Sequence, residues 1–145
     1  MTRLFAALLC ALALCGPAFA QERVVLVASE ASPIDSISSF EVRKLYMGIS
    51  LLNNGRFVRG LRNVSDERLN GVFLQSVVGL SAERYERRLL SNLLKYGTAR
   101  PAEYADSTDL LKALRADPLA VSYVWLRNEE TLEGVKVLRV LWQEF

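Results

Sequence analysis

Histidine is absent from this sequence of 145 residues, and its absence limits the chemistry that the chain can perform. Histidine is the usual general base near neutral pH and the commonest metal ligand. Cysteine is also scarce, since Cys10 and Cys15 are the only two and both lie near the N-terminus. Once residues 1–20 are removed, the chain has no thiol for a disulfide, a nucleophile or a metal ligand. We therefore expect no metal site and no cofactor.

The chain also has little net charge. The formal net charge is +2, and Arg3 is the only charged residue among the first twenty, which leaves 17 basic against 16 acidic residues. This near-neutral balance gives no electrostatic footprint for nucleic acid or for anionic lipid. After residue 20 no segment approaches the roughly 20 apolar residues that a spanning helix needs. We expect no nucleic-acid partner and no transmembrane segment in the mature chain.

Residues 1–20 have the pattern of a signal peptide. Arg3 supplies a short positive start, Leu4 to Cys15 is an unbroken apolar run, and Ala18-Phe19-Ala20 is the small-x-small pattern that signal peptidase cleaves after. We expect secretion across the inner membrane into the periplasm. The remaining residues, 21–145, have the length of a single domain.

The stretch from Arg59 to Gly79, RGLRNVSDERLNGVFLQSVVG, is predicted to run from a strand through a turn into an amphipathic helix. Ser65 is well placed as the helix N-cap. The apolar residues after it share one helical face: Leu69, Val72, Phe73 and Val77. A helix start attracts anions through its free N–H groups and dipole, although Asp66 and Glu67 would repel a phosphate. The stretch is thus either an ordinary capped helix or an anion site.

The other expected elements are strands and helices, which alternate only in the first part of the chain. Strands are predicted at Val24 to Ala28, Arg56 to Leu61, Ala120 to Leu126 and Val135 to Leu141. The expected N-caps of the other helices are Ser38 in a capping box with Glu41, Ser81, and Asp106 or Ser107. On the helix after Ser81, Tyr85, Leu89, Leu93 and Tyr96 form an apolar stripe, and Glu83, Arg84, Glu86, Arg87 and Arg88 indicate a solvated face. The order β, α, β, α, α, α, β, β favours an α/β domain of two or three layers with a mixed β-sheet.

Motifs for catalysis are missing from the sequence. No P-loop, GxSxG elbow, SxxK or calcium-loop spacing is present. The acid pairs Asp66-Glu67 and Glu129-Glu130 are neighbours in sequence, so their side chains point in different directions and form no dyad by themselves. We therefore expect a protein that is not an enzyme.

Several stretches, taken in order, resemble a known family. VVLVASEASPIDSISSFEVRKLYMG, VFLQSVVGLS and DPLAVSYVWL are similar to segments of the periplasmic substrate-binding proteins of phosphate ABC transporters, with gaps, from about Val24 to Leu141. The chain resembles their small one-lobe relatives, with a type 2 periplasmic-binding-protein-like lobe. In this family the ligand lies between helix N-termini and Ser or Thr hydroxyls. The family's Ser-Gly-Thr at the helix start is not found here.

The resemblance implies a solute-binding-like protein that binds phosphate or another small oxyanion for transport or sensing. Its predicted ligand-binding residues are Ser65 and the amides after it, with Arg62, Arg68 and Arg100 as charge partners. The alternative is a module without a ligand that docks onto an envelope sensor, transporter or complex, because one lobe cannot enclose an ion. A homodimer that rebuilds a two-lobed cleft is a further possibility.

Overall fold

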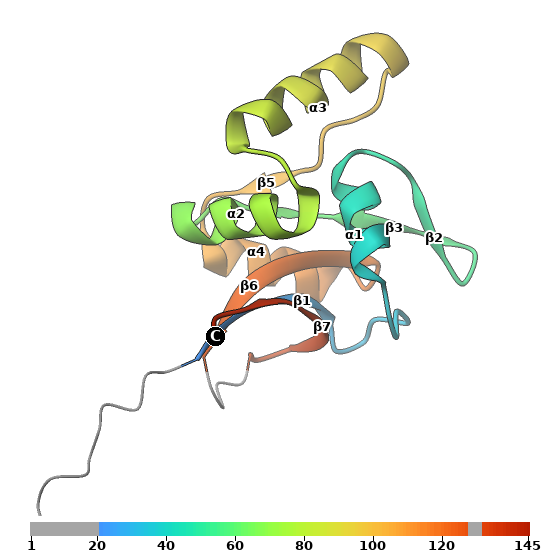
Figure 1. The fold of residues 1–145 in the computed structure, drawn as a ribbon. Helices are drawn as coiled ribbons and strands as arrows, with labels where there is room; N and C mark the ends of the chain where they lie inside the picture. The colour runs from blue at the N-terminus through green and yellow to red at the C-terminus, as the bar shows by residue number, and fades with distance from the viewer. Residues whose placement is uncertain (1–20, 128–131) are drawn as a thin grey trace, which may run out of the picture.

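The computed structural model describes residues 21–127 and 132–145. The predicted signal peptide, residues 1–20, and the Glu129-Glu130 pair both lie outside these residues. Within them the chain forms a curled mixed sheet with helices on both of its faces (Figure 1). This arrangement agrees with the predicted α/β class.

The sheet has five strands in the order β2-β3-β6-β1-β7. Strand β1 (Glu22–Ser29) pairs antiparallel with β6 (Ala120–Arg127) on one side and with β7 (Val135–Gln143) on the other. Strand β3 (Arg56–Gly60) runs parallel to β6, and β2 (Leu51–Asn53) closes the far edge antiparallel to β3. The first strand of the chain therefore lies inside the sheet, between the last two.

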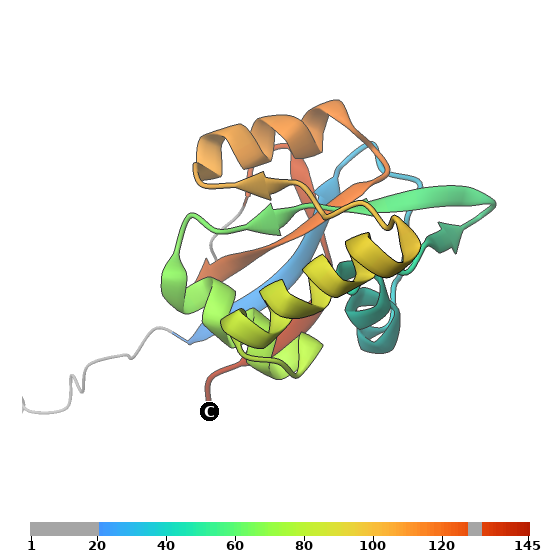
Figure 2. The ribbon, with the colours of Figure 1, turned by 90° about the horizontal axis from the view of Figure 1, so that it is seen from above.

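Successive residues of β1 serve two separate cores, because side chains alternate across a strand. Val24 and Leu26 pack into a core that the first three helices cover, whereas Val25 and Val27 pack beneath the fourth. The helices are α1 (Ser39–Tyr46), α2 (Glu67–Phe73), α3 (Ala82–Tyr96) and α4 (Ser107–Ala116). Figure 2 shows the sheet between α4 on one side and the other three helices on the other. The domain thus has three layers rather than two.

Local sequence signals fix several element ends where they were predicted. The Ser38 hydroxyl accepts a hydrogen bond from the Glu41 amide at 3.2 Å, and the Glu41 carboxylate accepts one from the Ser38 amide at 2.8 Å, which completes the capping box of α1. Asn54 and Gly55 have φ of 51° and 77°, the left-handed turn that joins β2 to β3. Ser81 caps α3, and Asp106 rather than Ser107 caps α4.

The predicted cap of the central helix, Ser65, is wrong by one residue. Asp66 is the N-cap, and its carboxylate accepts a hydrogen bond from the Leu69 amide at 2.9 Å. The Ser65 hydroxyl and amide both donate instead to the side-chain oxygen of Asn63, so Ser65 is held in the turn before the helix. A charged cap at this position also gains from the helix dipole, which a serine does not.

The same helix changes its winding after about two turns. Residues Leu74–Val78 form a π-helical segment, η1, which ends at Gly79 with φ of 77°. A π-helix has more residues per turn than an α-helix, so the buried face moves along by one residue. Leu74 and Val78 are therefore buried, whereas the α-helical spacing predicted that Val77 would be. The Gly79 amide closes this segment on the Leu74 carbonyl at 2.7 Å.

Three short strands were not predicted. Besides β2, these are β4 (Arg62–Asn63) and β5 (Glu103–Tyr104), which form a parallel two-stranded ladder of their own. They place Arg62, which follows the predicted strand Arg56 to Leu61, in a buried strand of its own. No helix within residues 21–127 and 132–145 is both long and apolar enough to cross a membrane.

The apolar stripe of α3 is only half covered. Tyr85 and Leu89 are buried, but the last turns expose most of their apolar side chains, with Leu94 and Tyr96 each 77% exposed. In Figure 1 this helix lies above the rest of the fold. Glu86, predicted on its solvated face, turns instead toward β4.

Candidate functional site

Arg62 is the centre of a charged cluster that joins β4, β5 and α3. The parallel register of the two short strands sets Arg62 opposite Glu103, and α3 places Glu86 beside them. One guanidinium nitrogen, Nη1, donates to the Glu86 carboxylate at 2.8 Å and also to the Glu103 carboxylate. The Arg62 side chain is only 4% exposed, so this cation is held inside the protein by its two carboxylate partners.

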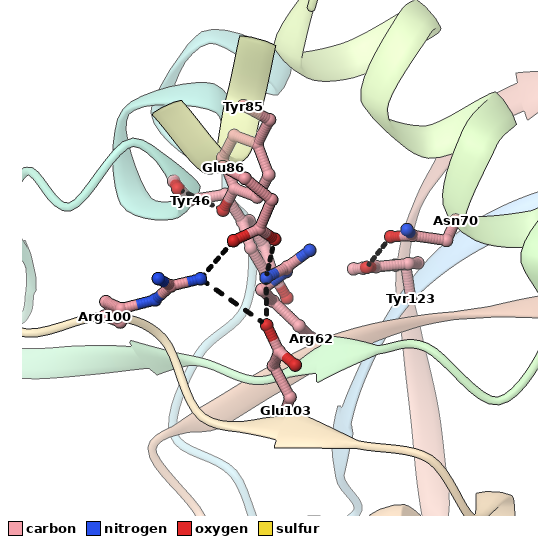
Figure 3. A network of polar contacts seen from close by, with 8 residues as sticks. All are labelled: Tyr46, Arg62, Asn70, Tyr85, Glu86, Arg100, Glu103 and Tyr123. Carbon is pink, nitrogen blue, oxygen red and sulfur yellow. Dashed lines mark hydrogen bonds and ion pairs between the residues drawn. The ribbon is translucent and has the colours of Figure 1, made fainter. Parts of the chain in front are cut away.

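Arg100 completes the cluster from the segment between α3 and β5. Helix α3 ends at Gly97, whose φ of 64° turns the chain back toward the ladder. From there the Arg100 guanidinium donates to the second oxygen of Glu86 and lies 4.0 Å from Glu103. Figure 3 shows both arginines directed at the same two carboxylates. We call Arg62, Glu86, Arg100 and Glu103 the Arg62 cluster.

The Glu86 carboxylate is held ionised by this arrangement. Partial burial raises the pKa of Glu86, but the hydrogen bond from Arg62 and the positive charges of Arg62 and Arg100 outweigh it, and the pKa is lowered from its ordinary value of 4.5. Each carboxylate oxygen takes one guanidinium partner. Because the cluster contains two arginines and two glutamates, its charges balance.

Buried tyrosines support the cluster without taking part in proton chemistry. The Arg62 guanidinium lies over the Tyr85 ring, 4.8 Å from its centroid, and the Tyr85 hydroxyl donates to the Tyr46 carbonyl (Figure 3). The Tyr46 hydroxyl donates in turn to the Leu61 carbonyl at 2.9 Å. Burial raises the pKa of Tyr85 to about 12, so near neutral pH it is a neutral hydrogen-bond donor. These rings fix the position of the cation.

Arg68, another of the predicted residues, lies in a different cluster. Arg68 pairs with Glu22 of β1, which also accepts a hydrogen bond from Arg127 at 3.1 Å, and we call these three residues the Arg68 cluster. The Arg68 guanidinium lies 4.7 Å from the centroid of the Trp125 ring. The Asp66 carboxylate accepts from the Leu69 amide and from the indole of Trp125, so the negative cap already fills the start of α2.

The structure therefore divides the predicted set into two parts. It brings Arg62 and Arg100 together, and it leaves Ser65 and Arg68 in separate contacts with Asn63 and Glu22. Sequence reasoning missed Glu86 and Glu103, which satisfy the paired arginines. The pairing of Glu103 follows from a ladder of two residues per strand, which carries no periodic signal.

A surface hollow of about 510 Å³ lies beside Arg100, between the end of α1, strand β3 and the segment at 98–102. Arg59 also lines it, but its guanidinium makes two hydrogen bonds of 2.6 Å to Asp117. Within the described part of the chain, no group of three or more histidine, cysteine or acidic side chains is placed to hold a metal ion. The hollow thus offers Arg100 access to solvent.

No protein-family model and no curated protein matches this sequence, whereas solved structures do. A protein from Clostridium perfringens, assigned as a phosphate ABC transporter substrate-binding protein and solved with bound phosphate, has a TM-score of 0.57 at 14% identity. PstS from Borrelia burgdorferi has a TM-score of 0.50 at 11% identity. The chain has the fold of part of these two solved proteins.

The matches cover most of this chain but less than half of each of the two solved proteins. The matches extend over 83% and 74% of this chain but over only 45% and 42% of the two proteins. The chain therefore spans less than half the length of each. What those proteins bind through their whole length is not carried over by the fold alone.

Proposed function

We propose that this chain is a periplasmic solute-binding-like protein, not an enzyme, that binds phosphate or another small oxyanion between Arg62 and Arg100. The observation that supports the proposal is the convergence of two guanidinium groups on the two oxygens of one carboxylate. Guanidinium groups match carboxylate and phosphate oxygens in the same planar fork geometry. Two arginines that hold a carboxylate can therefore hold an oxyanion of similar charge and oxygen spacing.

Burial and access both favour this pair over the other predicted residues. Arg62 is almost wholly buried, and its Nε has no hydrogen-bond partner in the described structure, while Arg100 is 39% exposed beside the surface hollow. An anion approaching from solvent meets Arg100 first. Ser65 and Arg68, by contrast, are engaged by Asn63 and Glu22, and the helix start near them carries the Asp66 carboxylate.

Titration calorimetry of residues 21–145 with phosphate, from micromolar to millimolar, tests the proposal, and sulfate serves as a second oxyanion. Arg100→Ala is expected to weaken phosphate binding about tenfold or more, because a charged hydrogen-bond donor is lost. The double variant Ser65→Ala with Arg68→Ala is expected to leave the affinity unchanged. Loss of affinity in the double variant but not in Arg100→Ala would place the site at the start of α2 instead.

A second candidate function is docking onto an envelope sensor, transporter or second copy of the chain. The observation that favours it is the exposed apolar surface at the C-terminal half of α3, formed by Leu90, Leu93, Leu94 and Tyr96. Exposed apolar side chains that gather on one element mark interaction sites in many proteins. Absence of heat and of any melting-temperature shift at millimolar phosphate would favour this candidate, and light scattering would then separate a homodimer from a monomer awaiting another partner.

A further inference from the structure

The position of Glu86 in the cluster has a consequence for ligand binding. Its two oxygens take the two contacts that an oxyanion would make with Arg62 and Arg100. A ligand and the Glu86 carboxylate therefore compete for the same donors. We propose that Glu86 is an internal competitor of the oxyanion, so that the affinity of the site depends on whether α3 keeps this carboxylate in place. This inference rests on the proposed function.

Glu103 does not have the same role. It belongs to β5, where it is fixed opposite Arg62 by the backbone ladder, and its contact with Arg100 is a long one of 4.0 Å. Glu86 instead belongs to a helix outside both sheets. When Glu86 leaves, Glu103 still balances one of the two arginines, and one positive charge becomes available to an anion.

Helix α3 is attached to the fold by few contacts. Of its fifteen residues only Tyr85 and Leu89 are buried. Besides the contacts of Glu86, the side-chain hydrogen bonds that tie α3 to the rest of the described chain are one from Tyr85 to the Tyr46 carbonyl and one from the Asn92 amide group to the Met47 carbonyl at 3.0 Å. A helix with little buried surface separates from its domain at low cost in free energy. Displacement of α3 removes the competitor and takes only Tyr85 and Leu89, its two buried residues, out of the core.

Arg62 supplies the driving force for the exchange. An unpaired charge inside a protein is costly, so a buried guanidinium that loses one carboxylate favours another anion in its place. Its Nε, which has no partner in the described structure, is a further donor on the same group. The oxyanion thus takes over the charge balance that Glu86 provides.

The test compares phosphate affinity, by calorimetry on residues 21–145, between the wild type and two variants, Glu86→Ala and Glu86→Gln. Glutamine keeps the size of the side chain and removes only its charge. Both variants are expected to bind phosphate about tenfold or more tightly than the wild type. Adding Arg100→Ala to Glu86→Ala is expected to abolish this gain. Circular dichroism and thermal unfolding establish that each variant is folded.

Glu83→Gln is the matched control. Glu83 lies three residues earlier on α3, is exposed, and pairs only with Arg87 at 3.6 Å among the contacts of the described chain. Its substitution removes the same charge from the same helix, so a general electrostatic effect would appear in both variants. We expect phosphate affinity to stay at the wild-type value. An equal gain in Glu83→Gln and Glu86→Gln would overturn the assignment of a competing role to Glu86.

The remaining outcomes separate this inference from the function on which it rests. Equal, measurable binding by the wild type and both Glu86 variants would leave the proposed function standing and overturn the inference. No binding by any folded variant would overturn both. Binding by the Glu86 variants alone would support the inference. It would show that the Glu86 carboxylate excludes phosphate from the paired arginines while α3 stays in its observed position.

Discussion

Two clusters of arginine and glutamate in this protein use the same groups in different surroundings. In the Arg62 cluster the central guanidinium is 4% exposed, whereas in the Arg68 cluster the arginine is 54% exposed. Exposed ion pairs contribute little to stability, because solvent and salt screen them and long side chains lose entropy. A buried charge, in contrast, depends on its partners. The comparison indicates that burial, rather than the number of ion pairs, identifies the arginine on which the structure and the proposed ligand both depend.

Arg62→Ala is expected to have the largest effect on this comparison. The substitution removes the charged hydrogen bonds to two glutamates and leaves space against the Tyr85 ring, and we expect a loss of about 2 to 3 kcal/mol in the free energy of unfolding. Urea denaturation of residues 21–145 measures it. Arg62→Lys keeps the charge without the planar fork and should fall between alanine and the wild type. A cost below about 1 kcal/mol for Arg62→Ala would remove the distinction between the two clusters.

Tyr85→Phe tests the support beneath the Arg62 cluster. The variant keeps the ring under the guanidinium and removes only the buried hydroxyl that donates to the Tyr46 carbonyl. We expect a loss of about 1 kcal/mol, the usual net worth of one buried hydrogen bond. Tyr96→Phe on the same helix is the control, since Tyr96 is exposed and its substitution should change the melting temperature little. Equal effects of the two substitutions would contradict the supporting role.

The sequence predicts those parts of the fold that short-range rules encode. The capping box at Ser38, the turn at Asn54 and Gly55, and the cap at Ser81 all depend on residues within four positions of each other. Strands β4 and β5 are too short to show a period, and their partners lie about forty residues apart. The choice between Ser65 and Asp66 as cap depends on Asn63, which engages the serine before the helix begins.

The candidate site was predictable only in its cations. Arg62, Arg68 and Arg100 were predicted as charge partners of the ligand, and the structure brings Arg62 and Arg100 together. Glu86 looked like part of a solvated face, because it belongs to a run of charged residues with Glu83, Arg84, Arg87 and Arg88. Its role depends on where a separate ladder places Arg62, and no local pattern contains that information. Partners that meet through tertiary structure require the fold before they can be recognised.

Lowering the pH is expected to reduce the stability of the protein by a smaller amount through the glutamates of both clusters. The salt dependence of this loss should differ between the two clusters. The pKa of Glu22 is lowered, first by its hydrogen bond from Arg68, and that of Glu86 is lowered by its two arginines despite burial. A carboxylate whose pKa is lower in the folded state stabilises the fold above its ordinary pKa of 4.5, and this contribution is lost as pH falls through the folded value. Glu22→Gln and Glu86→Gln should therefore each reduce the loss of stability between about pH 5 and pH 3.

Added sodium chloride should diminish the Glu22 contribution more, since exposed partners are screened more strongly. Thermal unfolding at two salt concentrations measures both, and equal salt responses would contradict the comparison.

Arg68→Ala is expected to have the smallest effect. Arg68 is half exposed, and its partner Glu22 keeps the hydrogen bond from Arg127 when Arg68 is removed, so Glu22 is not left without a cation. We expect a loss below about 1 kcal/mol in the free energy of unfolding, measured by urea denaturation beside Arg62→Ala. The guanidinium also covers the Trp125 ring, and loss of that packing accounts for any residual cost. Arg68→Met retains much of the side-chain volume and separates the two contributions. Full recovery in Arg68→Met would mean that this exposed arginine stabilises the protein through packing on tryptophan and not through its charge, which is the opposite of what the buried Arg62 is expected to do.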